Sequence, residues 1–393
     1  MSLADDAKLL LIPTGYKASK VYSVFPTDGD GDFTYTRSGD ASRVNPGGLI
    51  ETVGTNIPRI DHTGGGCPTL LLEPQRTNYC LNNTQLHLNS TLSSGATITL
   101  TGNYAIAPDG TLTATRIQAS GTGSNYAYLS MNGTNPTTDG SGSGYYRSSV
   151  YVKSNTGSNQ TIILFAAGAS APFTREVTTE WSRIEILGYR PANAKYTYIG
   201  YSSGADEELD FLVWGGQTEL VNSYASSLIY TGATIITRQK DQCYNGGDAD
   251  LFDISKGTFF IDANNFGTPL NAYSMITLSD GTLTNYIRFL YESSRIRVTL
   301  VSNNSTSIDY FITGVNDNER NKTLITFKEN EFKIYHNGIL KTTDTSGNVP
   351  INLDRFNFSM TNNFSRWFEG EIHDARVYDR VLTQTEAETL TTL

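Results

Sequence analysis

Short runs in which apolar and polar residues alternate make up most of the chain after about residue 90. Residues 111–118, 160–166 and 322–328 are examples, and turn-forming residues interrupt the pattern at intervals of roughly 8–12 residues. A period of two sends successive side chains to opposite faces of a strand, so each run can bury one face against a second sheet. The pattern predicts an all-β protein with two antiparallel β-sandwiches of the jelly-roll type, over residues 91–240 and 241–393.

Residues 1–90 lack such a period. A short helix is predicted over residues 2–11, and the rest consists of extended pieces broken by Gly and Pro. A segment of this kind can hardly bury a core of its own. We therefore expect it to become ordered by docking on a partner subunit or on the next domain.

Four arginines, Arg37, Arg43, Arg59 and Arg76, recur among the apolar pieces of this region. A guanidinium group presents a rigid fork of donors that can tie extended backbone. We predict that these arginines serve assembly within a collar over residues 33–78, whose deletion would leave folded sandwiches that no longer assemble. The alternative is that they are solvent-facing charges on loops.

One further helix is predicted at the C-terminal end of the sequence. Thr383 and Glu386 have the spacing of a capping box, in which the Thr side chain accepts from the N3 amide and the Glu side chain reaches back. The helix is expected over residues 383–390.

Composition supports the β assignment and excludes several partners. Gly (36 residues) and Tyr (23 residues) are frequent, while charged residues make up only 17%; aromatic residues favour strands and Gly favours tight turns. The net charge is −10 and no basic run is present, so a nucleic-acid partner is not expected. No segment approaches the ~20 apolar residues of a membrane span, so membrane insertion is not expected either.

Metal sites are weakly indicated. The three cysteines and four histidines are scattered, whereas zinc sites need clustered ligands. Asp28, Asp30 and Asp32 alternate with Gly as in calcium loops, but the sixth and twelfth positions are Phe33 and Gly39 rather than Gly and Glu. A solvated turn is the favoured interpretation, Ca²⁺ is the weak alternative, and no other cofactor is expected.

Catalytic motifs are missing from the sequence. Glycoside hydrolysis needs two opposed carboxylates, but Glu369 and Glu371 are two residues apart in a predicted strand and so share one face. No G-x-S-x-G elbow is present. The sequence therefore favours a protein that is not an enzyme.

Aromatic side chains are the best candidates for a binding site, because they can stack on the apolar C–H faces of sugar rings. Trp181, Trp367, Tyr145 and Tyr146 lie on strands or near their ends and are the predicted glycan-binding residues. Core packing or cross-strand pairing is the alternative for each of them. Trp214 lies in a nearly continuous apolar run and is expected in the core.

The C-terminal part resembles a known family. Residues 333–338 (KIYHNG) predict a tight hairpin, and residues 368–382 (FEGEIHDARVYDRVL) predict a closing strand that leads into the final helix. These motifs resemble the laminin-G-like or concanavalin A-like lectin/glucanase sandwich, and the resemblance extends back to about residue 255. The catalytic carboxylate motif of the hydrolytic members is missing, which implies the binding branch of that family.

Two other segments resemble parts of bacteriophage virion proteins. Residues 211–219 (FLVWGGQTE) and 224–234 (YASSLIYTGAT) are similar to the carbohydrate-binding-module-like domains of phage virion proteins. Residues 9–13 (LLLIP), 33–37 (FTYTR) and 70–78 (LLLEPQRTN) resemble a segment found in structural proteins of tailed bacteriophages.

Together these resemblances imply a head or tail fibre or appendage of a tailed phage, located in the virion and made in the cytoplasm of the host. Residues 1–90 would anchor it to other virion proteins of capsid or tail, and the lectin-like domains would bind host cell-surface polysaccharide. A homotrimer is the assembly that the resemblance to phage fibres implies. Two alternatives stay open, a capsule depolymerase (glycoside hydrolase or lyase) and a purely structural joint between virion proteins.

Overall fold

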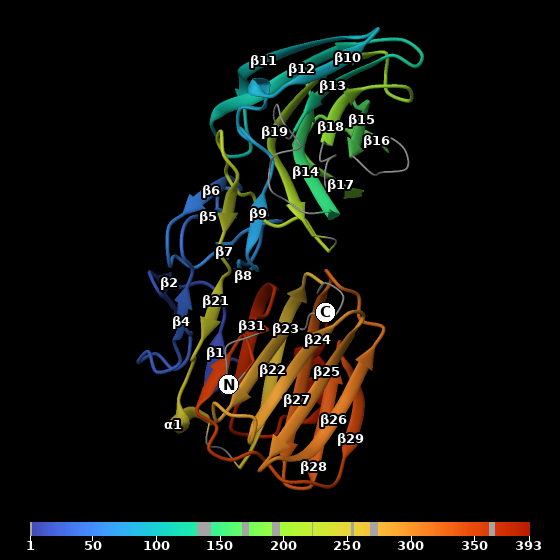
Figure 1. The fold of residues 1–393 in the computed structure, drawn as a ribbon. Coiled ribbons are helices and arrows are strands. Elements are labelled where there is room, and N and C mark those ends of the chain that lie inside the picture. The colour runs from blue at the N-terminus through green and yellow to red at the C-terminus, as the bar shows by residue number, and fades with distance from the viewer. Residues whose placement is uncertain are drawn as a thin grey trace. The chain divides into compact units, whose positions relative to one another are not determined.

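The computed structural model describes residues 2–131, 143–166, 173–190, 197–221, 223–252, 255–267, 274–360 and 366–393. The chain divides into two compact units (Figure 1). Unit 1 consists of Met1–Asp40, Val53–Pro74 and Gln239–Leu393, and unit 2 of Ala41–Thr52 and Gln75–Arg238. Residues 1–90, which the sequence pattern sets apart as one region, are therefore divided between the two units.

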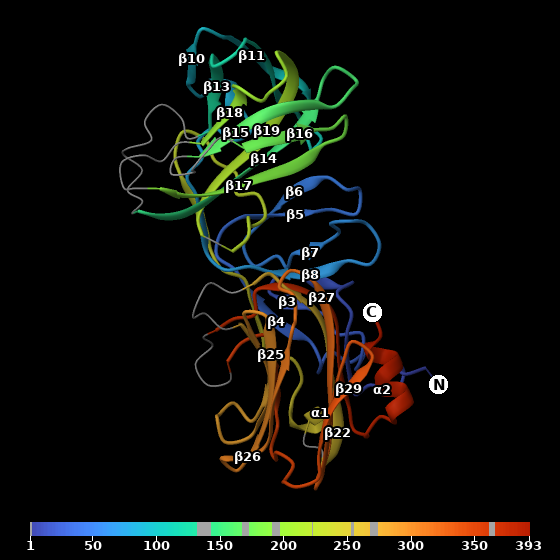
Figure 2. The ribbon, with the colours of Figure 1, turned by 90° about the vertical axis from the view of Figure 1, so that its right-hand side faces the viewer.

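Unit 1 is a sandwich of two antiparallel sheets, seen as two layers in Figure 2. The strand order of its first sheet is β29-β28-β27-β22-β31-β8-β7, and β1 also pairs with β31. The bounds are β1 Leu9–Leu11, β7 Ile60–Asp61, β8 Thr69–Leu72, β22 Lys256–Asn265, β27 Arg320–Lys328, β28 Glu331–His336, β29 Ile339–Asp344 and β31 Gly370–Tyr378.

The second sheet of unit 1 has the order β26-β25-β24-β23-β30, and a smaller sheet has the order β2-β3-β4-β21. The bounds are β23 Ser274–Ser279, β24 Tyr286–Glu292, β25 Arg295–Ser302, β26 Ser305–Thr313 and β30 Arg355–Asn357, then β2 Tyr16–Lys17, β3 Lys20–Val21, β4 Phe33–Thr36 and β21 Gln242–Tyr244, with the helix α1 at Ala249–Phe252.

The N-terminal segments belong to the core of unit 1. Leu9, Phe33 and Leu70 are fully buried in one cluster with Phe259 of β22 and Phe289 of β24. Such segments can be ordered inside one chain because the sandwich offers them a sheet edge and an apolar interior. The segments Met1–Asp40 and Val53–Pro74 thus dock on the C-terminal sandwich, whereas residues 41–52 and 75–90 belong to unit 2 with the next domain along the chain.

The predicted helix over residues 2–11 is wrong. Leu9, Leu10 and Leu11 pair instead with Val377, Arg376 and Ala375 of β31. Hydrogen bonding to a sheet edge and burial of the leucines outweigh the local signal for a helix, because helix propensity is a weak preference that tertiary contacts override.

The C-terminal helix is confirmed, as is its cap. The helix α2 spans Gln384–Thr391, Thr383 Oγ1 accepts from the amide of Glu386, and the Glu386 side chain accepts from the amide of Thr383. Its buried Ala387 packs with Leu324 of β27 and Tyr335 of β28, and Figure 2 shows the helix against this face.

Unit 2 is a second sandwich. Its sheets have the orders β10-β13-β18-β15-β16 and β11-β12-β19-β14-β17, and the short pairs β5-β6 and β9-β20 complete it. The bounds are β5 Ala41–Val44, β6 Ile50–Val53, β9 Arg76–Asn78, η1 Leu86–Leu88, β10 Thr91–Ser94, β11 Thr97–Ile106, β12 Leu112–Ser120, β13 Tyr126–Ser130, β14 Gly144–Ser154, β15 Gln160–Ala166, β16 Phe173–Val177, β17 Ser182–Arg190, β18 Thr197–Tyr201, β19 Glu208–Leu220 and β20 Ile236–Arg238.

The core of unit 2 follows the alternation of the sequence. Leu129 of β13, Leu164 of β15 and Ile199 of β18 face Val150 and Phe211 of the other sheet. Trp214 is fully buried, as predicted, and lies in a separate cluster with Ile50 and Leu228. The predicted all-β fold with sandwiches and a short C-terminal helix is thus confirmed.

Candidate functional site

A row of aromatic side chains crosses one sheet of unit 2. The rings of Tyr126 and Tyr128 from β13 are stacked with centroids 5.4 Å apart, and the Tyr198 ring from β18 lies 5.6 Å from that of Tyr128. Phe165 of β15 continues the row, with its centroid 6.5 Å from that of Tyr198. We call these four residues the aromatic row.

The row lies on the outer face of the sheet because its members alternate with core residues. Ala127 and Leu129 face the interior on either side of Tyr128, and Tyr198 pairs directly with Phe165 of the neighbouring strand. Stacked cross-strand aromatic pairs stabilise a sheet by a few tenths to about 1 kcal/mol each. The Tyr128 ring, between two others, is only 8% exposed, and burial raises the pKa of its hydroxyl. That hydroxyl is therefore a neutral donor and acceptor.

A polar hollow of about 430 Å³ lies on the same sheet, at the other end of β15. Its lining includes Thr161, Thr174, Glu176 and Asp206. Thr161 and Phe165 are four residues apart along β15, so their side chains point to the same face of the sheet. The hollow and the row therefore lie on the same face. Asp206 accepts from the amide of Thr161 at 2.7 Å, and Glu176 accepts from the Asn159 side chain at 2.6 Å.

Together the row and the hollow offer the two kinds of contact that a saccharide needs. The exposed parts of the half-buried rings of Tyr126, Tyr198 and Phe165 can contact sugar C–H groups, while carboxylates, amides and hydroxyls can bind sugar hydroxyl groups. Glu176 and Asp206 are exposed, so their carboxylate oxygens can accept hydrogen bonds from sugar hydroxyl groups.

The predicted glycan-binding residues of unit 2 do not lie in this row. Trp181 packs on the cluster around Trp214, and its Nε1 donates to the carbonyl of Ile106 at 3.3 Å. Tyr146 is fully buried, with its ring 5.9 Å from that of Tyr79. Tyr146 therefore offers no ring face to a ligand, whereas Trp181 is half-buried.

Tyr145 is different. It is 52% exposed and meets the exposed Tyr189 of β17 edge to face at 5.3 Å. The two residues pair directly across β14 and β17, in the sheet opposite the aromatic row. Tyr145 thus presents an exposed ring, at a place separate from the row.

Trp367 belongs to unit 1 and is half-buried. Its ring lies 5.9 Å from that of Tyr244, and the Lys240 Nζ lies 5.4 Å from its centroid. A lysine above a ring uses one of its faces through a cation–π contact. The four predicted residues are therefore divided between the two units.

Two of the four arginines predicted to serve assembly are buried. The side chains of Arg37 and Arg59 are fully buried in unit 1 and paired with Asp241, and Arg59 also with Glu73. Arg37 further donates to the carbonyls of Val53, Gly54 and Ile57. Such groups cannot face another subunit in this fold, because their donors are used inside the unit.

The other two arginines lie in unit 2 and are half-buried. Arg43 pairs with Glu51 across β5 and β6 at 2.8 Å, and the Arg76 guanidinium lies 5.7 Å from the centroid of the Tyr224 ring. Their role in assembly stays a prediction.

The acidic loop of unit 1 uses its carboxylates locally. Asp28 accepts from the amide of Asp30, while Asp32 accepts from the amide of Ser23 and pairs with Lys20. Across the described residues, no group of three or more His, Cys, Asp or Glu side chains is arranged to hold a metal ion. The loop therefore shows the hydrogen bonds of a turn.

The carboxylates considered for catalysis lie along β31 and the residue before it. Glu371 accepts from the Asn264 side chain, and burial raises its pKa. Burial also raises the pKa of Asp374, against the effect of the neighbouring Arg376, with which it pairs. Asp374 thus has a structural partner in Arg376. This ion pair does not resemble an acid and a base on opposite sides of a cleft.

Sequence reasoning missed the aromatic row because it treated tyrosines singly. The alternation Tyr126-Ala-Tyr128 was a signal that two rings share a face. The contributions of Tyr198 and Phe165 depend on strand register, which the sequence does not state.

Residues 260–388 match the family model of the concanavalin A-like lectin/glucanases superfamily. The predicted resemblance of the C-terminal part to this superfamily is thereby confirmed. No curated protein matches the chain. None of the described helices is long and apolar enough to cross a membrane.

Several solved structures are similar to part of the chain. The CBM40 of the Ruminococcus gnavus IT-sialidase bound to α2,3 sialyllactose is 19% identical, covering 38% of this chain and 91% of its own, with a TM-score of 0.33. Domain 4 of AbnA, a GH43 extracellular arabinanase from Geobacillus stearothermophilus, in complex with arabinotriose, is 14% identical. The match covers 39% of this chain and 73% of that domain's chain, with a TM-score of 0.32. The receptor-binding domain of botulinum neurotoxin type G is 18% identical. The match covers 38% of this chain and 41% of the neurotoxin chain, with a TM-score of 0.30.

Proposed function

We propose that this protein binds glycans without cleaving them, through the aromatic row and the polar hollow of unit 2. The carrying observation is the run of near-parallel rings from Tyr126 to Phe165 on an outer sheet face, beside a hollow lined by polar groups. Single exposed aromatics are common on proteins, but a row across three strands is a specific feature. The match of residues 260–388 to a lectin/glucanase superfamily supports the same class of ligand.

The ligand of this face is a neutral saccharide. In the described residues of β10, β13, β15, β16 and β18, the positions that share the outer face carry no Lys or Arg, and Glu176 is a carboxylate. An anionic sugar would meet like charge there and no compensating cation.

The biological setting that we propose is the virion of a tailed phage, where the protein would be a fibre or appendage of head or tail. The support is the resemblance to phage structural proteins of five segments, residues 9–13, 33–37, 70–78, 211–219 and 224–234. Partners would be other virion proteins and the polysaccharide of the host surface, and the assembly a homotrimer. Weak sites suit that role, because several copies on one particle multiply avidity.

A glycan array with the purified protein tests the binding. Neutral oligosaccharides from host surface polysaccharide should be retained, and Tyr198→Ala should weaken the best of them at least about tenfold, which is roughly 1.4 kcal/mol. Tyr189→Ala, which removes an exposed ring of the opposite sheet, is the matched control and should leave the affinity within about twofold. Equal losses in the two variants, or no retained glycan, would refute the assignment of the face.

Hydrolysis is tested separately, because two carboxylates line the hollow. Host capsule incubated with the protein should release no reducing ends. Sustained release that Glu176→Gln or Asp206→Asn abolishes would establish a depolymerase instead.

A further inference from the structure

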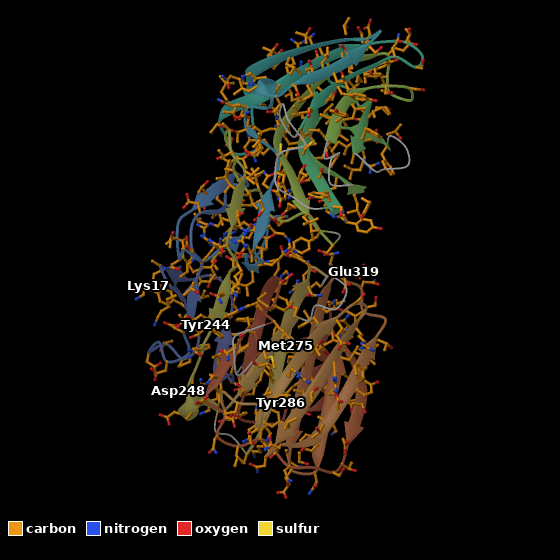
Figure 3. All side chains as sticks on the ribbon, in the orientation of Figure 1. Lys17, Tyr244, Asp248, Met275, Tyr286 and Glu319 are labelled. Atoms are coloured by element: carbon orange, nitrogen blue, oxygen red, sulfur yellow. The ribbon has the colours of Figure 1, made fainter. Side chains whose placement is uncertain are left out.

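The second sheet of unit 1 carries a cationic cluster on its outer face. Ile287, Phe289 and Val298 point into the core, so the alternate residues Arg288 and Arg297 point outward. Register places Arg288 opposite Thr299, and Arg297 opposite Phe311 of β26. Met275 and Tyr286, on the neighbouring strands β23 and β24 of this sheet, are labelled in Figure 3.

Two arginines of this face pair with carboxylates. Arg297 binds both oxygens of Asp309 through its Nε and Nη2, at 2.7 and 2.6 Å. Arg295 pairs with Glu292. Both guanidinium groups also lie over the Phe311 ring, 4.7 Å from its centroid for Arg295 and 5.0 Å for Arg297. These two groups are satisfied within the sheet.

Arg288 is not satisfied in this way. Its Nη2 donates to Thr299 Oγ1 at 3.2 Å, its guanidinium lies 5.1 Å from the Tyr286 ring centroid, and no carboxylate pairs with it among the described residues. Its Nε is buried and has no hydrogen-bond partner. A buried donor without an acceptor costs free energy, so the Nε of this group is held at a cost.

The surroundings increase that cost. Burial lowers the pKa of Arg288, and the positive charges of Arg297 and Arg366 lower it further, against the opposing effect of Asp309. The chain as a whole carries a net charge of −10, so this concentration of arginines does not follow from composition. Groups held at a cost in free energy often mark functional sites.

We propose that Arg288 receives the carboxylate of an acidic saccharide. The planar fork of an arginine matches a carboxylate with two parallel hydrogen bonds, and Nη1, which makes no hydrogen bond to a described residue, is one of the donors required. Phe311 lies two strands away, about 10 Å across the sheet, and is 38% exposed, so the part of its ring that Arg295 and Arg297 leave uncovered can touch a sugar. The site is in unit 1 and selects anionic sugars, so it is distinct from the neutral-glycan face of unit 2.

Trigalacturonic acid and its methyl ester test the charge requirement on the full chain, because esterification removes the carboxylates and keeps the sugar rings. N-acetylneuraminic acid, measured beside them by isothermal titration, separates uronic from sialic acids as the source of the carboxylate. At least one acid should bind. Where trigalacturonic acid is the ligand, its ester should bind at least about tenfold more weakly. Binding should weaken as NaCl is raised, since exposed charges are screened. Failure of both acids to bind, or equal binding of trigalacturonic acid and its ester, overturns the proposal.

Variants locate the site and separate function from structure. Arg288→Gln should lose at least tenfold in affinity, and Arg288→Lys should recover only part of it because the fork is missing. Arg355→Gln, on β30 of the same sheet and paired with Asp354, should change affinity less than twofold. Arg288→Gln should unfold at the same urea concentration as the wild type or a higher one. Unchanged acid binding, or lower stability of this variant, contradicts the proposal. Acid binding should persist in Tyr198→Ala, so the two sites fail independently.

Discussion

Arg37 and Asp241, 204 residues apart in the sequence, form an ion pair in which both side chains are fully buried. The Nη1 of Arg37 lies 3.2 Å from Oδ1 of Asp241. The other carboxylate oxygen pairs with Arg59 and accepts from the amide of Glu73. Burial opposes the charge of Arg59, but the carboxylates of Asp241 and Glu73 outweigh it and raise its pKa well above the usual value. One network thus joins the segments of unit 1 that lead into unit 2.

Asp241→Asn is expected to destabilise unit 1 by about 3–5 kcal/mol, because it leaves two buried guanidinium groups with a single carboxylate. Urea unfolding measures the change, and hydrogen exchange can assign it to unit 1. The matched control is Glu331→Gln, which breaks exposed pairs with Lys328 and Lys333 and should cost roughly 0–1 kcal/mol. A loss below about 1 kcal/mol for Asp241→Asn would mean that the network contributes little to stability.

Local sequence patterns were enough to predict most of the strands and the C-terminal helix. Alternation located the strands of both sandwiches, and the Thr383–Glu386 spacing located the cap of α2. Asn337 and Gly338 both have positive φ between β28 and β29, as the predicted tight hairpin requires.

Local patterns could not predict which residues far apart in the sequence pair with each other. Leu70 pairs with Ile372, and the arginines of the N-terminal part pair with Asp241, which no local spacing indicates. For the same reason one half of the aromatic row, Tyr126 and Tyr128, was visible in the sequence, while Tyr198 and Phe165 depended on register.

Deletion of residues 33–78 is now expected to unfold unit 1 rather than leave folded sandwiches. The segment contains β4, β7 and β8, and its Phe33, Leu70 and Leu72 are fully buried in the core. Leu70→Ala alone should cost about 2–5 kcal/mol. Leu49→Ala, at a side chain 42% exposed, should cost about 0.5 kcal/mol or less. Circular dichroism and urea unfolding of the three variants check this, and a folded deletion variant would show that these strands are dispensable.

The cap of α2 makes part of the stability depend on acid pH. Hydrogen bonds from Arg380, and then from the amide and hydroxyl of Thr383, lower the pKa of Glu386 to about 2. A carboxylate whose folded pKa lies below its unfolded value stabilises above the unfolded value, near 4.5, and loses that effect as pH falls toward 2. The stability difference between wild type and Glu386→Gln should therefore be larger at pH 7 than at pH 3. A difference that does not change with pH would contradict the ionised cap.

His336 makes a second contribution to stability that acid removes. Here acid adds a positive charge to a neutral ring, whereas at Glu386 it neutralises a carboxylate. Burial, with a smaller effect of Lys341, lowers its pKa to about 4, and its Nδ1 is 3.0 Å from Thr323 Oγ1. The neutral ring is the folded form, so protonation favours unfolding and stability falls as pH decreases from about 6.5 to 4. An NMR titration of the ring protons should give a midpoint near 4 for this residue. A midpoint near 6.5 would mean that the ring is open to water.

Calcium is expected to have no effect on stability. The carboxylates of Asp28 and Asp32 already serve a turn and an ion pair, and repulsion from Asp28, with smaller effects of Asp248 and Asp250, raises the pKa of Asp30. A cation that bound there would relieve this repulsion and stabilise the folded state by mass action. Thermal unfolding in excess chelator and in millimolar CaCl₂ should therefore give the same midpoint, and Asp30→Asn should be neutral or slightly stabilising. A midpoint that rises with CaCl₂ in the wild type but not in Asp30→Asn would establish a calcium site in this loop.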